Sequence, residues 1–208
     1  MPKRHTEAVQ HSSKDPNWRT PPQLFAALRE EFPLFIDVAA TKQDKLCPHY
    51  FGPDQVDETL RNGLTVDWKA YADRYYDTLS IERVAVFMNP PYSRELKQPI
   101  GPWIQKAWEE SLKGLTVVGV IPYSVQTEWW REWVEGHGTE ESDQGPVLTW
   151  SGHAARETRK IPHRVTFLRP DGSVEGNAGG NTAIVVWKPP CGIYGPYVPA
   201  AFYWEYES

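Results

Sequence analysis

The sequence predicts an α/β fold: a mainly parallel sheet with an antiparallel hairpin at one edge and helices on both faces. Three observations indicate this class. Strand-like runs alternate with helix-like runs along the chain, as they do in parallel α/β sheets. The segment 115–122 is apolar throughout, which is typical of a strand buried on both faces. Two β-rich segments, 163–168 and 181–189, flank a glycine-rich turn and predict the hairpin.

In the first half of the chain, a helix is indicated by Leu24, Phe25 and Leu28, which recur at helical spacing. Thr20 stands before a Pro-Pro pair and can cap this helix. A β-branched and aromatic run then predicts the strand that leads into NPPY. The expected elements are a helix at 22–31, a strand at 34–40, a short strand or turn at 48–52, a helix at 72–84 and a strand at 83–88.

In the second half, Gly114 is placed to stop a helix and Thr127 to start the next one. The expected elements are helices at 102–113 and 127–136 and strands at 115–122, 147–150, 163–168 and 181–189. We expect residues 1–17 to be a flexible leader, 18–190 to be a single domain with a basic loop near 151–163, and 191–208 to be a C-terminal tail.

The composition excludes several classes of protein. Two cysteines give no disulfide framework, and no apolar run reaches the length of a membrane span, so a cytoplasmic protein without membrane contact is expected. The formal charge of −5 argues mildly against sequence-blind adhesion to nucleic acid. Between residues 153 and 169, however, the basic residues Arg156, Arg159, Lys160, Arg164 and Arg169 face the single acid Glu157. This stretch can dock a phosphate backbone, although a solvated loop is an equally good interpretation.

The motif NPPY (89–92) follows an apolar strand directly. Two prolines fix the backbone and donate no hydrogen bond, so the Asn89 side chain and the Pro90 carbonyl are held as acceptors. Tyr92 offers a flat face for a planar ring. The strand at 34–40 ends on the acid Asp37 and the small residues that follow it. The carboxyl ends of parallel strands meet at one edge of a sheet, so Asp37 and Asn89 should lie near each other.

Two fixed acceptors beside an aromatic ring suit a heterocycle that carries an –NH2 group. The lone pair of such an amine is delocalised into the ring, so the amine is a poor nucleophile. Accepting both of its hydrogens concentrates charge on nitrogen and orients it for attack on an activated electrophile. No strong base is required first, because the proton leaves once the nitrogen becomes cationic.

Here the sequence resembles the phage-type DNA N6-adenine methyltransferase family, whose members have a Rossmann-like methyltransferase fold and depend on S-adenosylmethionine. The resemblance covers about residues 17–190. It is carried by WRTPPQLFAAL (18–28), FIDVAAT (35–41), CPHYF (47–51), GLTVDW (63–68), NPPYS (89–93) and GLTVVGVIP (114–122), in the expected order.

The resemblance implies roles for individual residues. Asn89, Pro90, Pro91 and Tyr92 would be catalytic, and Tyr92 and Ser93 would contact the substrate base. The implied S-adenosylmethionine site comprises Thr20, Pro21, Asp37, Ala39, Ala40, Thr41 and Asn89. The turn at 39–41 has no glycine, and Asn62 replaces the acid that the family often has before its Gly-Leu pair, so Asp57, Glu58 and Asp67 are only weak candidates for binding the ribose.

Other side chains have both a functional and a structural interpretation. Tyr123 can line the substrate pocket, and Arg156, Arg159, Lys160 and Arg164 can contact DNA, whereas a surface salt bridge explains Arg164 equally well. Trp129, Trp130 and Trp133 are expected to pack a helix onto the sheet, with one of the first two able to edge the substrate site. Cys47 and His49 lack the paired spacing of zinc ligands, so no metal is expected.

The function that we predict from the sequence is methyl transfer from S-adenosylmethionine to N6 of adenine in double-stranded DNA, with the adenine flipped out of the helix. The short chain leaves little room for a separate recognition domain, so short or relaxed specificity is expected. Methylation of cytosine N4, RNA or a protein amide remains an alternative, as does a catalytically silent nucleic-acid-binding protein of the same fold. The resemblance also suggests a phage or prophage protein that shields DNA from restriction.

Overall fold

The computed structural model describes residues 18–75, 84–92, 99–142, 145–150, 154–169, 171–174, 181–190, 200–204 and 206. Its helices are α1 (Pro22–Glu31), the 3-10 helix η1 (Glu58–Leu60), α2 (Trp68–Asp73), α4 (Gly101–Leu112) and α5 (Glu128–Trp133). Its strands are β1 (Leu34–Asp37), β2 (His49–Tyr50), β3 (Ala85–Met88), β4 (Thr116–Pro122), β5 (His137–Ser142), β6 (Gly145–Trp150), β7 (Glu157–Lys160), β8 (Thr182–Trp187) and β9 (Ala200–Tyr203).

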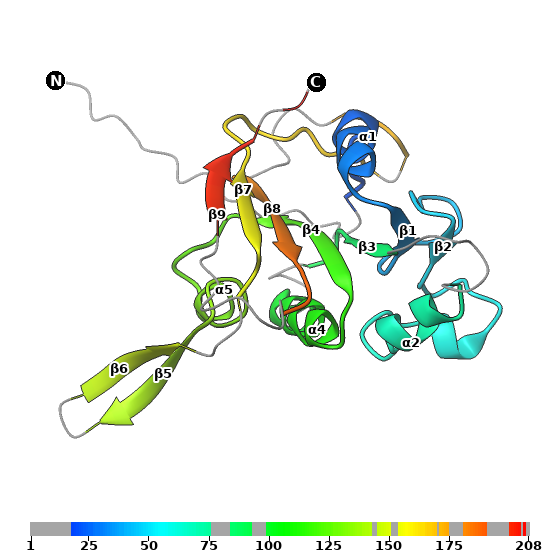
Figure 1. Ribbon diagram of the computed structural model, residues 1–208. Helices are drawn as coiled ribbons and strands as arrows, with labels where there is room; N and C mark the ends of the chain where they lie inside the picture. Colours follow the sequence, from blue (N-terminus) through cyan, green and yellow to red (C-terminus); the bar gives the residue numbers. More distant parts are fainter. Residues whose placement is uncertain are drawn as a thin grey trace, which may run out of the picture.

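Seven of these strands form one mixed sheet in the order β2-β1-β3-β4-β8-β7-β9 (Figure 1). Strands β2, β1, β3 and β4 are parallel, and β7 is parallel to β9. Strand β8 inserts between β4 and β7 and runs antiparallel to both. The expected mixed sheet of a Rossmann-like methyltransferase fold is therefore confirmed.

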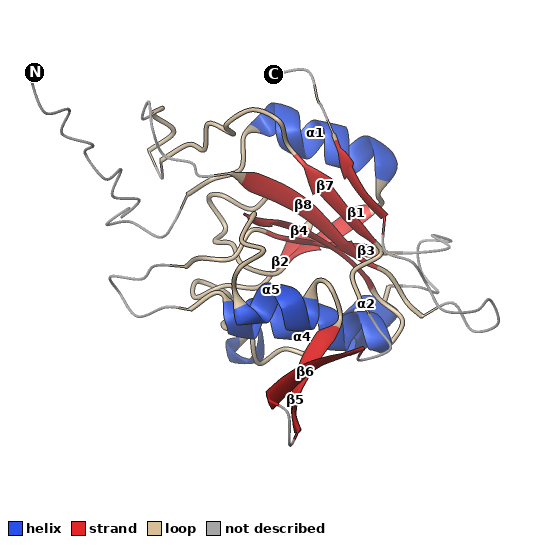
Figure 2. Cartoon of the chain, turned by 90° about the vertical axis from the view of Figure 1, so that its left-hand side faces the viewer, coloured by secondary structure: helices blue, strands red, loops and turns tan. Residues whose placement is uncertain are grey.

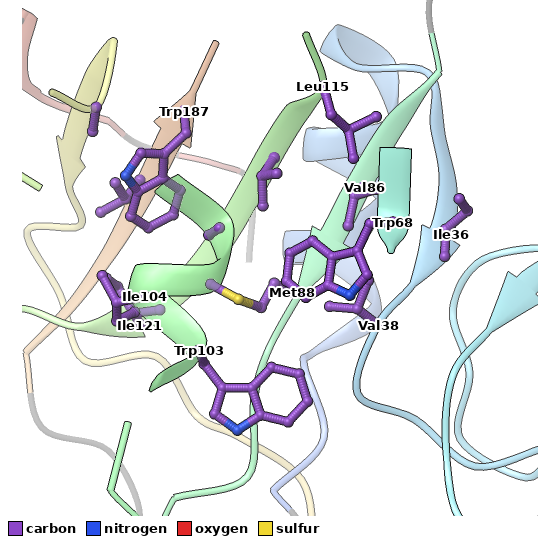
Figure 3. Packing of buried hydrophobic residues seen from close by; sticks show 14 of the residues in the cluster. Ile36, Val38, Trp68, Val86, Met88, Trp103, Ile104, Leu115, Ile121 and Trp187 are labelled. Carbon is purple, nitrogen blue, oxygen red and sulfur yellow. The ribbon is translucent and has the colours of Figure 1, made fainter. Parts of the chain in front are cut away.

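Helices cover both faces of the sheet, because residues of each central strand point alternately to opposite sides. Figure 2 shows α1 on one face and α2, α4 and α5 on the other. In β3, Ala85 and Phe87 join the cluster under α1, and the Phe87 ring lies edge-on to Phe25 with the ring centroids 5.1 Å apart. Val86 and Met88 belong to the opposite cluster, in which tryptophans from several elements surround Met88 (Figure 3).

Most of the predicted elements up to α5 are observed. Pro21, not Thr20, occupies the N-cap position of α1. Thr127 is the N-cap residue of α5, as predicted, although its side chain makes no cap hydrogen bond. Helix α2 starts at Trp68, where a loop was expected, and much of the predicted helix at 72–84 lies outside the described residues. Gly114 has a positive φ of 103° after α4, which confirms its predicted role as the stop.

The late elements differ more from the prediction. The supposed basic loop contains β7, which is the partner of β8 in the antiparallel pair. The predicted strand at 163–168 forms only two isolated bridges, both at Leu168. Part of the expected tail is the edge strand β9. The strand predicted at 147–150 belongs to β6, which pairs with β5 in a separate sheet that projects from the body (Figure 1).

Within the described parts of the chain, no helix is long and apolar enough to cross a membrane. The expected leader, residues 1–17, lies outside those parts.

Candidate active site

Asp37 and Asn89 leave the sheet at the same edge. Strands β1 and β3 are parallel neighbours, with Asp37 opposite Phe87, and the Val38 amide donates to the Phe87 carbonyl over 3.1 Å. Asn89 follows β3 and lies two residues beyond Phe87, so it shares the face on which Phe87 and Asp37 lie. The structure thus brings together the two strand-end residues that the sequence singled out.

The Asn89 amide is held by the segment that precedes α1. Its Nδ2 donates to the Trp18 carbonyl over 3.1 Å and to the Thr20 hydroxyl oxygen over 3.0 Å. Because both bonds engage the nitrogen of a planar amide, the Oδ1 oxygen is directed away from residues 18–20. Beside it, Pro90 is buried and Tyr92 is 41% exposed. The motif therefore combines an oriented acceptor with an accessible aromatic ring.

Asp37 is a buried carboxylate held by backbone amides. It accepts hydrogen bonds from the Leu46 amide over 3.2 Å and, more weakly, from the Ala39 amide over 3.4 Å. Burial raises the pKa of Asp37 to about 7, and the nearby charge of Asp44 adds to this shift. The described part of the chain supplies no lysine or arginine ion pair to Asp37. A ligand cation would therefore find a carboxylate whose charge is poorly compensated.

Arg19 is a nearby cation whose Nε atom lacks a hydrogen-bond acceptor among the described residues. This atom is buried, and a carboxylate oxygen of Asp44 lies 3.9 Å away. The other Asp44 oxygen accepts from the Thr41 amide over 2.5 Å and from the Thr41 hydroxyl over 2.7 Å. Asp44 therefore links Arg19 to the loop after β1. A buried acid without a cation and a buried guanidinium donor without an acceptor suit the ammonium and carboxylate groups of an amino-acid moiety.

The sequence reasoning missed Arg19, although it directly precedes the Thr20-Pro21 pair. Its position beside that pair was the available signal. The burial of its Nε atom and its proximity to Asp44 depend on tertiary contacts and cannot be read from the sequence.

The backbone of the loop after β1 lies in close contact with glycines from two other segments. A Cβ atom on Gly52 would lie 1.6 Å from the Ala40 carbonyl oxygen, and one on Gly63 would lie 2.0 Å from the Val38 carbonyl oxygen. The Ala40 amide also donates to the Phe51 carbonyl over 3.1 Å. The turn at 39–41 contains no glycine. Gly52 and Gly63 instead provide the space beside its backbone, since neither has a side chain.

Replacing Gly52 by alanine is expected to lower the free energy of unfolding by about 1–3 kcal/mol, because the new methyl group meets backbone rather than a movable side chain. Thermal or urea unfolding would measure the change. Gly101→Ala is the matched control, since the nearest atom to its new Cβ, on Trp129, is 3.9 Å away. Equal stability of the two variants would contradict the close packing at Gly52.

A second group lies along the same edge, beyond β4. Tyr123 follows β4, and its amide donates to the Asn181 carbonyl over 2.8 Å just before β8. Lys160 ends β7 opposite Ala183 and Tyr203. Its Nζ is 5.1 Å from the centre of the Tyr123 ring and 5.9 Å from that of Tyr203, and the interaction with the Tyr123 side chain raises the pKa of Lys160. Tyr203 is 72% exposed and lies in the segment predicted to be a tail, so the sequence reasoning missed it.

The other predicted DNA contacts do not gather there. Arg159 is only 5% exposed and forms ion pairs with Glu31 and Glu157, so its assignment to DNA is corrected to a role in holding β7. Arg156 stands at the opposite end of β7, four residues or about 13 Å from Lys160. Arg164 is exposed beyond β7, and Ser93 lies outside the described residues.

The weak candidates for ribose binding make contacts away from the loop after β1. Asp57 caps η1, Glu58 pairs with Arg61, and Asp67 caps α2 and pairs with Lys113. Asp54, which follows β2, instead accepts from the Lys42 amide over 2.8 Å and so reaches the loop after β1. An acid near the end of the second strand is the usual ribose partner in Rossmann-type sheets. The sequence reasoning did not consider Asp54.

Cys47 and His49 do not share a site. Cys47 is buried near Asp37, and burial raises the pKa of its thiol, whereas His49 Nδ1 lies 3.0 Å from the Tyr71 hydroxyl. Across the described ranges, no three His, Cys, Asp or Glu side chains are grouped for metal binding.

Trp130 of α5 is buried in the cluster on the face of the sheet opposite α1. Its ring lies edge-on to Tyr123, with the ring centroids 5.2 Å apart. The nearby Trp133 lies 4.9 Å from Trp108, between ring centroids. The expected packing of α5 onto the sheet is therefore observed.

The mixed sheet with helices on both faces is that of a Rossmann-like methyltransferase fold. Comparison with known families gave a match over residues 7–141, about two thirds of the chain, to the family described as DNA N-6-adenine-methyltransferase (Dam). The chain belongs to this family. Neither the search of curated proteins nor the search of solved structures gave a match.

Proposed function

We propose that this protein transfers the methyl group of S-adenosylmethionine to N6 of adenine in double-stranded DNA. Membership of the Dam family supports DNA adenine methylation as the activity. The observation that carries the finer proposal is the orientation of Asn89, whose nitrogen is engaged by Trp18 and Thr20 while its oxygen is directed elsewhere. An oriented acceptor is what an exocyclic amine requires.

The residues around Asp37 fit the amino-acid end of S-adenosylmethionine, which supplies a methyl group on a sulfonium when bound. Asp37 would hold the ammonium group and Arg19 the carboxylate, while Ala39, Ala40 and Thr41 border the site and Asp54 holds the ribose. Pro21 and Asn89 would border the methyl group from the side of α1. Two observations support this arrangement: Asp37 is buried with its pKa raised, and the buried Arg19 Nε makes no hydrogen bond among the described residues.

In the proposed reaction, the Asn89 oxygen and the Pro90 carbonyl accept the two hydrogens of the adenine amine. Tyr92 stacks on the flipped base and orients its nitrogen toward the methyl carbon. Bound S-adenosylmethionine would supply the methyl group on its sulfonium, and the Asn89 and Pro90 acceptors would hold the amine toward it while one N6 proton is released to water. Catalysis comes from orientation and preorganised hydrogen bonds.

Lys160, Tyr123 and Tyr203 would contact the DNA beside the flipped adenine, and Arg164 would bind a phosphate farther along the backbone. Their support is that Lys160 and the two tyrosines lie at the edge where β1 and β3 end. We also propose a short or relaxed recognition sequence. A long, unique methylation site found by sequencing would contradict that expectation.

The deciding experiment is methylation with labelled S-adenosylmethionine on duplex DNA, RNA and protein, followed by mass spectrometry of the nucleosides. We expect N6-methyladenine from duplex DNA. Product found only as N4-methylcytosine, or label only in RNA or protein, would contradict the proposal. If the folded protein binds no S-adenosylmethionine in calorimetry, a silent nucleic-acid-binding role replaces it.

Lys160→Ala is expected to weaken binding of duplex DNA by about three- to tenfold and to reduce its salt dependence, because one phosphate contact is lost. Fluorescence anisotropy at several salt concentrations would measure both effects. Arg156→Ala is the control, since it removes the same charge at the other end of β7. Equal weakening by both variants would contradict a local contact at Lys160.

A further inference from the structure

The segment Trp18–Thr20 lies between Asn89 and Leu168. We infer that Trp18 and Thr20 are positioning residues, which hold the Asn89 amide in the orientation that presents its oxygen to the substrate amine. This inference rests on the proposed function and gives Thr20 a role different from the cofactor contact that the family resemblance implied.

The bond to the Trp18 carbonyl determines which way the Asn89 amide faces, and the bond to Thr20 helps to hold it there. A backbone carbonyl can only accept, so the Asn89 atom that faces the Trp18 carbonyl at 3.1 Å must be the nitrogen. The second hydrogen of that nitrogen is directed to the Thr20 hydroxyl oxygen at 3.0 Å. A flipped amide would lose the Trp18 bond and place two carbonyl oxygens against each other, so the Trp18 carbonyl opposes the flip. The Thr20 hydroxyl, which accepts from the amide nitrogen, holds the amide in place through a second hydrogen bond.

The partners are themselves held in place. The Arg19 amide donates to the Leu168 carbonyl over 2.8 Å, and the Leu168 amide donates to the Arg19 carbonyl over 3.0 Å. The middle residue of the segment thus bonds to Leu168, while its two neighbours bond to Asn89. Thr20 is only 4% exposed, and Pro21 fixes the backbone that follows it before α1 begins.

This arrangement makes the acceptor geometry of β3 depend on a segment about 70 residues earlier in the chain. Neither Trp18 nor Thr20 needs to touch the adenine. Their effect on catalysis would pass through the Asn89 amide, because a rotating amide presents its donor to the amine for part of the time. A donor at that point repels the hydrogens of the amine.

The test compares Thr20→Val, which keeps the shape but removes the hydroxyl, with Thr20→Ser, which keeps the hydroxyl. We expect Thr20→Val to lower the single-turnover rate on duplex DNA about tenfold at saturating cofactor, since one orienting hydrogen bond is lost. Thr20→Ser should stay within about threefold of the unmodified protein. The Kd for S-adenosylmethionine, measured by calorimetry, should be unchanged in both.

An unchanged rate in Thr20→Val, or a raised Kd with an unchanged saturated rate, would overturn the inference and favour a direct cofactor contact. Asn89→Asp is a second test that does not depend on the folding of Thr20→Val. Aspartate keeps the acceptor but lacks the donor for Trp18, so we expect at least a tenfold loss of rate. A fully active Asn89→Asp would show that the donor is dispensable. If the unmodified protein forms no N6-methyladenine, the proposed function fails, which is a separate result.

Discussion

Asn89→Ala is expected to reduce methyl transfer to duplex DNA by at least about a hundredfold, with the Kd for S-adenosylmethionine within about threefold of the unmodified protein. Alanine removes the side-chain acceptor, whereas Pro90 and Pro91 still fix the backbone. The amine would keep one acceptor, the Pro90 carbonyl, and lose its orientation. The main loss should therefore be in the rate and not in cofactor affinity.

Single-turnover kinetics with labelled cofactor would measure the rate, and calorimetry would measure the Kd. Gln105→Ala is the matched control, since it removes an exposed side-chain amide from the surface of α4, where the Gln105 amide donates to Glu109. Activity of Asn89→Ala within a few-fold of the control would show that the Asn89 acceptor is not part of the mechanism.

Asp37→Asn is expected to weaken cofactor binding by about a hundredfold while it stabilises the ligand-free protein at pH 8. The raised pKa of about 7 means that the folded state favours the protonated acid, whereas the unfolded chain has the ordinary value of 3.8. Stability is therefore lost as the pH rises from about 4 to above 7, by up to about 4 kcal/mol. Asparagine avoids this charge but loses part of the hydrogen bonding, so a net gain of about 1–2 kcal/mol at pH 8 is expected.

The same pKa predicts how cofactor affinity depends on pH. Only the ionised Asp37 attracts an ammonium group, so the affinity should fall about tenfold per pH unit below pH 7. Calorimetry between pH 5.5 and 7.5 would measure this effect, below the range of about 7.7–8.0 in which an α-amino group loses its proton. Asp37→Asn should bind with a pH-independent Kd over the same range. An equally steep dependence in that variant would assign the titration to another group.

The central part of the fold could be predicted because its strands are apolar on both faces. Strands β3, β4 and β8 read as buried runs, and α1 shows helical spacing. Strand β7 could not be recognised, because ETRK resembles an exposed loop. It is a strand because Arg159, although buried, has its charge compensated by Glu31 from α1, a partner that is distant in sequence. The segment HRVTFL has higher β propensity, but propensity does not decide which segment finds a partner in the sheet.

The site was predictable where it depends on strand ends. Asp37 and Asn89 follow from the rule that polar residues gather at the carboxyl edge of a parallel sheet. The contacts that complete the site connect distant segments, as those of Arg19 with Asp44 and of Thr20 with Asn89 do. Arg159 and Lys160 are adjacent in β7, so their side chains point to opposite faces of the sheet. For this reason Arg159 forms ion pairs, whereas Lys160 lies near Tyr123.

The insertion of β8 beside β4 bears on how the protein can be dissected. The region that matches the family ends at residue 141, within β5, and so excludes β8. A recombinant fragment cut at that point would leave the apolar strand β4 as an open edge, with Val118 and Val120 deprived of their partners Val186 and Ile184. Open apolar edges recruit strands from other molecules. Such a fragment should therefore self-associate. The region that matches the family is thus shorter than the region that we expect to fold without an open sheet edge.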